Sequence, residues 1–306
     1  MELKDLFKDE IAQKTFGNNY SKPQYLCWKH RFEPDNFEPC VIPHTAIAEI
    51  IYCQSQQQKF KFNPASIGVT VQQVVQKISK TFRKEMTRDG ISEDDLRGKP
   101  GNPFSEKEKP WKVAYKWLWE QKYSRWLWNR LKEKAVANRI WIDFRQNNHE
   151  PIDKAKSMTG MLKKSFKGDR ILPINQSLQM QLELKDSGKY LFLLNRGLNK
   201  QHQETRYLVC PSQAFAPNCE IVESFFSMPQ QEAMLEDIQF DAPGQEEYIG
   251  ILMDNKLELP WLNPIYYPVL EWSAKHLSEL CEQLEKMDNN WQILYQCFEV
   301  SQSNQS

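Results

Sequence analysis

Glycine is scarce in this sequence, with 11 in 306 residues, and the glycine-rich patterns that bind nucleotide phosphates are missing. Neither GxGxxG nor GxxxxGK[ST] occurs, and the GxSxG, HExxH and EF-hand patterns are missing as well. Together these absences lower the expectation of catalysis. We therefore predict a protein that is not an enzyme and that carries no cofactor.

Long apolar runs are also lacking. No stretch approaches 18 consecutive apolar residues, and the first twenty residues contain no apolar segment of the kind that directs export. We expect a cytoplasmic protein that does not enter a membrane. In that compartment its seven cysteines, an odd number, are expected to be reduced and mostly buried.

The chain as a whole has no net charge, but each of its halves does. The 40 basic and 40 acidic side chains cancel, yet residues 1–170 carry 32 Lys and Arg against 21 Asp and Glu, and residues 171–306 carry 8 against 19. Such a division indicates either two different partners or two halves that neutralise each other internally.

The first half of the sequence has helical periodicity. Helices are predicted over residues 45–57, over residues 70–88 with apolar side chains at helical spacing, and over residues 111–138, where tryptophans broaden the apolar stripe. Ser92 is a suitable N-cap for a short helix after Gly90. Residues 139–145 alternate as a half-buried strand would.

The second half has the pattern of strands. They are expected over residues 177–184, 190–194, 207–210, 220–226 and 248–253, followed by a helix over residues 272–287 and a strand over residues 291–300. The predicted fold class is α+β, with a basic, mainly helical domain (1–150), a linker (151–170) and an acidic immunoglobulin-like β-sandwich with a C-terminal helix (171–306).

One group of residues has the composition of a zinc site. Two close pairs of thiol and imidazole ligands, as a tetrahedral Zn²⁺ ion requires, lie within eighteen residues at Cys27, His30, Cys40 and His44. The order Cys-His-Cys-His is unusual. The alternative is a small packed loop with ordinary buried cysteines and surface histidines.

A metal-dependent nuclease can also be assembled from the sequence. Asp169 with Glu183 and Lys185 has the acid and E-x-K composition that binds Mg²⁺ and positions a water. Strand alternation already explains Glu183 and Lys185 as solvent-facing residues before a turn, so the nuclease is the weaker interpretation.

Basic and aromatic residues interleave in the segment KWLWEQKYSRWLWNRLK. Such a surface can stack on bases and contact phosphates, which makes nucleic-acid binding by residues 51–170 our alternative function. The side chains that would carry it are Lys112, Lys116, Lys122, Arg125, Arg130 and Lys134. The competing interpretation is that the tryptophans belong to a hydrophobic core.

Residues 170–260 carry a set of short patterns: GKYLFLLN (188–195), YLVCP (207–211), MP (228–229), FDAPGQE (240–246) and IGIL (249–252). In these patterns the segment resembles a bacterial domain of unknown function, number 4384, which is appended to caspase-like proteases, protein kinases and other signalling or defence proteins. The resemblance implies a β-sandwich with a recognition or accessory role. It supplies no catalytic residues.

We therefore expect a non-enzymatic adaptor or regulatory protein of bacterial signalling or defence, whose partner is a protein such as a caspase-like protease, a kinase or another effector. Aromatic side chains in the loop LPWLNPIYYP are the expected partner-binding residues: Trp261, Tyr266 and Tyr267. The alternative is that these aromatics pack the C-terminal helix onto the sandwich.

Overall fold

The computed structural model describes residues 2–17, 21–97, 108–136, 139–146, 171–184, 190–262, 269–287 and 291–302. The chain divides into two compact units, Met1–Trp126 and Leu127–Ser306. The expected mixture of α and β structure, helical in the first half and stranded in the second, is confirmed. None of the helices in the described ranges is both long and apolar enough to cross a membrane.

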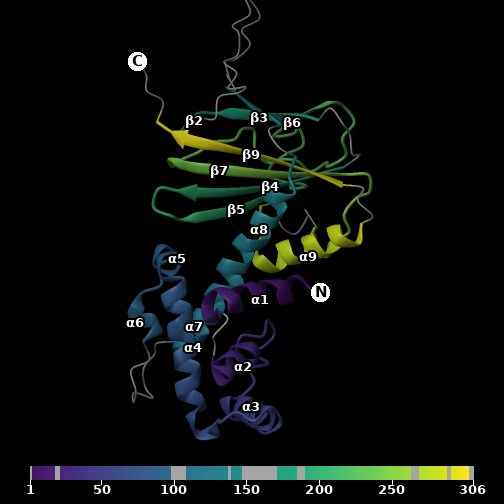
Figure 1. The fold of residues 1–306 in the computed structure, drawn as a ribbon. Coiled ribbons are helices and arrows are strands. Elements are labelled where there is room, and N and C mark those ends of the chain that lie inside the picture. The colour runs from purple at the N-terminus through teal and green to yellow at the C-terminus, as the bar shows by residue number, and fades with distance from the viewer. Residues whose placement is uncertain are drawn as a thin grey trace, which may run out of the picture. The chain divides into compact units, whose positions relative to one another are not determined.

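The first unit is helical (Figure 1). Its elements are α1 (Leu3–Phe16), α2 (Lys22–Arg31), α3 (His44–Gln58), η1 (Pro64–Ser66), α4 (Ile67–Thr81), α5 (Arg83–Arg88), α6 (Glu93–Leu96), α7 (Pro110–Lys116) and the π-helical turn η2 (Trp117–Lys122). α8 (Tyr123–Glu133) begins in this unit and ends in the next. α3 and the 110–133 stretch agree with the predicted helices, whereas α1 and α2 were not predicted.

Apolar periodicity determines how these helices pack. The stripe of α4, from Val71 through Val74 to Ile78, is buried, and the predicted 70–88 helix is interrupted at Phe82, which is buried between α4 and α5. Ser92 caps α6, as predicted, and also exchanges hydrogen bonds with Asp95 in a capping box. The packing of these helices buries aromatic side chains, such as Phe82, that could otherwise serve as a stacking surface.

The second unit contains two sheets. Its strands are β1 (Ile142–Gln146), β2 (Ile171–Pro173), β3 (Leu178–Glu183), β4 (Tyr190–Asn199), β5 (Glu204–Cys210), β6 (Phe225–Met228), β7 (Gly244–Met253), β8 (Leu270–Glu271) and β9 (Trp291–Ser301). The small sheet has the order β1-β3-β6, and the large sheet has the order β2-β9-β7-β4-β5-β8. β5, β4, β7 and β9 lie next to one another in Figure 1 in their pairing order.

One hydrophobic core lies between the two sheets. It combines Phe144 and Met180 of the small sheet with Leu193 and Phe298 of the large one. Gly250 in the middle of β7 is necessary for this packing, because a Cβ there would lie 2.5 Å from the ring of Trp141. The two sheets are thereby held at close contact.

The opposite face of the large sheet carries helices. Side chains alternate along a strand, so neighbours of core residues point to this second face. Trp128 of α8 is fully buried there and stacks on Trp272, with ring centroids 5.2 Å apart and an interplanar angle of 4°. α9 (Ala274–Lys286), the predicted C-terminal helix, buries an apolar stripe that includes Leu277, Leu280 and Leu284.

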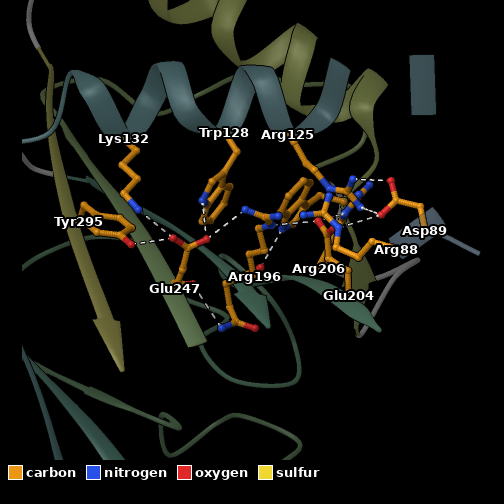
Figure 2. Close-up of polar contacts among 12 residues, drawn as sticks. Arg88, Asp89, Arg125, Trp128, Lys132, Arg196, Glu204, Arg206, Glu247 and Tyr295 are labelled. Carbon is orange, nitrogen blue, oxygen red and sulfur yellow. Dashed lines mark hydrogen bonds and ion pairs between the residues drawn. The ribbon is translucent and has the colours of Figure 1, made fainter. Parts of the chain in front are cut away.

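Glu247 of β7 ties these layers together, as Figure 2 shows. Its carboxylate accepts hydrogen bonds from Trp128 Nε1 (3.1 Å), Lys132 Nζ (3.0 Å), Arg196 Nη1 (3.1 Å) and Tyr295 Oη (2.6 Å). Burial raises the pKa of Glu247, but the hydrogen bonds from Tyr295 and Lys132 and the charge of Arg196 lower it overall below the usual value. The ionised carboxylate is therefore the stable form.

The boundary between the units lies earlier in the chain than the expected linker at 151–170. β1 follows the helical unit in sequence, yet it pairs with β3 from Ile142↔Leu182 to Gln146↔Leu178 and so belongs to the stranded unit. The expected 151–170 linker itself lies outside the described residues. Residues 220–226, expected as a strand, contribute only the start of β6, which runs from Phe225 to Met228.

Substituting Glu247 tests the importance of this contact. Glu247→Ala removes the common acceptor of Arg196, the Trp128 indole N–H and the Tyr295 hydroxyl. We therefore expect the free energy of unfolding to fall by about 3 kcal/mol. Glu247→Gln retains part of the hydrogen bonding and should cost less. Urea denaturation followed by circular dichroism measures the loss. Glu299→Gln, an exposed position in β9, is the control, and equal stability of Glu247→Ala and Glu299→Gln would contradict the prediction.

Candidate functional site

The four candidate zinc ligands do not form a metal site. Among the described residues, no group of three or more His, Cys, Asp or Glu side chains is placed to hold a metal ion. Cys27 is buried and Cys40 is exposed. Burial raises the pKa of Cys27 to about 12, and burial together with the charge of Arg31 lowers the pKa of His44 to about 4. The guanidinium of Arg31 is buried near Cys27 and His44, and its positive charge disfavours the binding of a metal cation there.

The expected partner-binding aromatics are accounted for in part. Trp261 stacks on His276 of α9, with ring centroids 4.6 Å apart, and meets Phe192 of β4 edge-on at 6.1 Å. The packing alternative is therefore confirmed for Trp261, because its ring joins the C-terminal helix to the sheet. Tyr266 and Tyr267 lie outside the described residues.

The basic side chains of the nucleic-acid alternative are largely paired with acids. Lys112 pairs with Glu38, Lys116 with Glu108 at 2.8 Å, Lys122 with Glu85 at 2.5 Å, and Arg125 with Asp89 at 2.6 Å, the last pair drawn in Figure 2. Arg130 is partly buried, and Lys134 lies 5.4 Å from the ring of Trp291. A carboxylate or a ring already neighbours these cations, so their charge is partly compensated within the protein.

Two tryptophans of the same segment, Trp117 and Trp128, belong to the core and are not available to stack on bases, whereas Trp119 and Trp126 are half-buried. Of the nuclease triple, Glu183 lies at the end of β3, whereas Asp169 and Lys185 lie outside the described residues.

The best candidate site is a cavity of about 510 Å³ in the second unit. It lies between β4, β5 and β7 of the large sheet on one side and residues 235–242 on the other, with Met180 of the small sheet among its lining residues. Its walls are both apolar and polar. The volume lies in the range of about 300–1,000 Å³ that is usual for ligand pockets.

The polar part of the cavity is centred on Glu246. Asn195 Nδ2 of β4 donates a hydrogen bond of 2.7 Å to Glu246 Oε2, while no hydrogen bond from the described residues reaches Oε1. Gly197 of β4 lies opposite Glu246 in the β4–β7 register. A Cβ at Gly197 would lie 2.7 Å from Glu246 Oε1 and 2.4 Å from Thr205 Oγ1, so a larger residue here would require these side chains to move.

The cavity environment disfavours the ionised form of Glu246. Burial is the main cause that raises its pKa to about 7; the negative charge of Asp241 adds to this, and the hydrogen bond from Asn195 opposes it. The phenol of Tyr207 has a raised pKa for the same reasons, burial first and then nearby carboxylates that include Asp241 and Glu246. Glu246 is thus a carboxyl group that can exchange a proton near neutral pH.

The sequence contained a partial signal for this site. Asn195 ends the pattern GKYLFLLN and Glu246 ends FDAPGQE, two patterns on which the family resemblance depends. The structure brings them together across the β4–β7 pair. Gly197 and Asp237, which also line the cavity, were missed, because neither belongs to a motif.

Comparisons of the chain with protein-family models, with curated proteins and with solved structures found no match.

The pKa of Glu246 has a consequence for stability. Because its pKa rises from 4.5 in the unfolded chain to about 7 in the fold, the stabilisation from the protonated form is complete below about pH 4.5 and is lost as the pH rises through 7. Glu246→Gln keeps an acceptor for Asn195 and removes this titration. We expect the variant to gain about 2–3 kcal/mol over wild type between pH 4.5 and 8.

Urea denaturation at a series of pH values measures this difference. Glu247→Gln is the matched control from the adjacent position, because the lowered pKa of Glu247 gives the opposite sign: its stabilisation is present above the unfolded value and is lost as the pH falls. A Glu246→Gln profile parallel to wild type would show that Glu246 does not titrate near pH 7.

Proposed function

We propose that this chain is a non-enzymatic accessory protein that binds a protein partner through the cavity in its second unit. The observation that supports it is the cavity itself, a concave site with apolar walls and a few convergent polar groups centred on Glu246. No Ser, Cys, His or Lys of the described residues lines it, so the Ser–His and Cys–His pairs of nucleophilic catalysis are missing from this part of its lining.

The resemblance of residues 170–260 to domain 4384 supports the kind of partner. That family accompanies caspase-like proteases, kinases and other effectors, so we propose an effector of a bacterial signalling or defence system as the partner. We also interpret the two-sheet unit as a relative of the immunoglobulin-like sandwich. The common core between its sheets supports this interpretation.

Leu235 offers a way to block the cavity without disturbing the core. It lines the cavity, yet its side chain is 42% exposed, so the fold should tolerate a larger residue there. Met234 is the matched control, because it is the adjacent apolar residue, is exposed and does not line the cavity. Leu235→Trp should fill part of the cavity, whereas Met234→Trp should leave it open.

The full-length tagged chain, its Leu235→Trp variant and its Met234→Trp variant would be used for affinity capture from the native host, with and without nuclease. We expect wild type and Met234→Trp to retain the same protein partner, and Leu235→Trp to retain at least about tenfold less, which corresponds to 1.4 kcal/mol. Quantitative mass spectrometry measures the amounts. Partners that Leu235→Trp retains in full, or that nuclease releases, would contradict the proposal, the second in favour of nucleic acid.

A further inference from the structure

Among the described residues, the lining of the cavity is acidic: Asp237, Asp241 and Glu246 contribute carboxyl groups, and no Lys, Arg or His from this part of the chain lines it. The nearest basic residue along β4, Arg196, alternates to the opposite face, where it binds Glu204 at 2.9 Å and Glu247 at 3.1 Å. The sheet thus separates charge, with Lys132 and Arg196 on one face and the acidic lining of the cavity on the other.

The remaining walls suit an apolar stem that ends in a cation. Phe215, Phe240, Tyr207 and Tyr248 supply aromatic surface. Aromatic faces attract ammonium and guanidinium groups and also cover methylene chains. A negatively charged or purely polar guest would use only part of this lining.

One oxygen of Glu246 is available to such a guest. Oε2 is engaged by Asn195, and Oε1 lies over the open position at Gly197 without a hydrogen bond from the described residues. A carboxylate whose one oxygen is fixed by an amide is already oriented, so a cationic donor at Oε1 loses less entropy on binding.

We propose that the cavity binds a lysine or arginine side chain of a protein partner, with the cationic group at Glu246 Oε1. This inference rests on the proposed function and specifies what the partner presents. A polypeptide is the natural source of this chemistry, because the cavity joins an acidic end to apolar walls that a side-chain stem and its flanking residues can cover.

Binding of a cation is coupled to release of a proton. Glu246 faces Asp241, Tyr207 and Tyr248, of which Asp241 and the burial of the site disfavour its charge. A cation at Oε1 reverses this preference and lowers the pKa of Glu246 from about 7. Affinity should therefore increase as the pH rises through 7, with proton uptake by the buffer on binding.

Short peptides of the form acetyl-Gly-Gly-X-Gly-Gly-amide test the proposal with the full-length chain. Isothermal titration at pH 7.5 would compare Arg with citrulline at X, which match closely in shape and differ in charge, and Lys with acetyl-lysine, which is longer by an acetyl group and lacks the charge. We expect the charged peptide of at least one pair to bind about tenfold or more tightly than its neutral partner. Titration in two buffers of different ionisation enthalpy should show the released proton.

Variants connect the effect to the site. Glu246→Gln should reduce the affinity for the charged peptide about tenfold or more, and Glu299→Gln, a neutralised exposed carboxylate outside the cavity, should not. Equal binding of charged and neutral peptides, or equal affinity of wild type and Glu246→Gln, would overturn the inference. So would tighter binding of free spermidine than of either charged peptide.

The failures of the two proposals can be told apart. A partner whose capture is lost in Leu235→Trp but retained in Glu246→Gln would leave the proposed function intact and overturn the cationic side chain. A partner that is indifferent to Leu235→Trp would overturn the proposed function first.

Discussion

The alternation of side chains along β7 places two adjacent carboxyl groups, Glu246 and Glu247, on opposite faces of the large sheet. Glu247 meets a lysine, an arginine, a tyrosine and an indole N–H, and it is held ionised. Glu246 meets one amide and a second carboxyl, and its pKa is raised to about 7. The arrangement of the second unit depends on this separation. Ion pairs with Lys132 and Arg196 cover Glu247 on the helical face of the sheet, whereas the opposite face lines the acidic cavity at Glu246.

Close backbone approach at two glycines makes the division possible. Gly250 allows the ring of Trp141 to lie against β7, which closes the core between the sheets. Gly197 leaves the space into which Glu246 and Thr205 extend. The sheet is therefore closely packed near Gly250 and lines the cavity near Gly197. The difference comes from the side chain beside each glycine, which is Trp141 at Gly250 and Glu246 at Gly197.

Much of the fold could be predicted from local patterns. The apolar stripe of α4, the tryptophan-rich 110–133 stretch and the alternation of β3 determined their secondary structure directly. The strand was predicted only over the apolar run 190–194, but pairing with β7 carries β4 to Asn199. Here the pairing of strands that are distant in sequence overrides local preference. Local sequence patterns contain no information about that pairing.

The site could be predicted far less well. Asn195 and Glu246 are 51 residues apart, and they meet only because the β4–β7 register places Asn195 beside Tyr248 and Gly197 beside Glu246. A slip of one residue would have turned Glu246 to the helical face. The zinc hypothesis failed for the related reason that sequence spacing does not determine which side chains converge, and the buried Arg31 lies among its proposed ligands.

Charge at long range is consistent with a basic partner for the second unit. Residues 171–306 carry 19 acidic against 8 basic side chains, so an approaching cation is attracted before it reaches the cavity, while a polyanion is repelled. The basic half offers no equivalent surface in Lys112, Lys116, Lys122 and Arg125, because each of them is paired with a carboxylate. The acidic charge of residues 171–306 therefore agrees with the proposed cationic guest of the cavity.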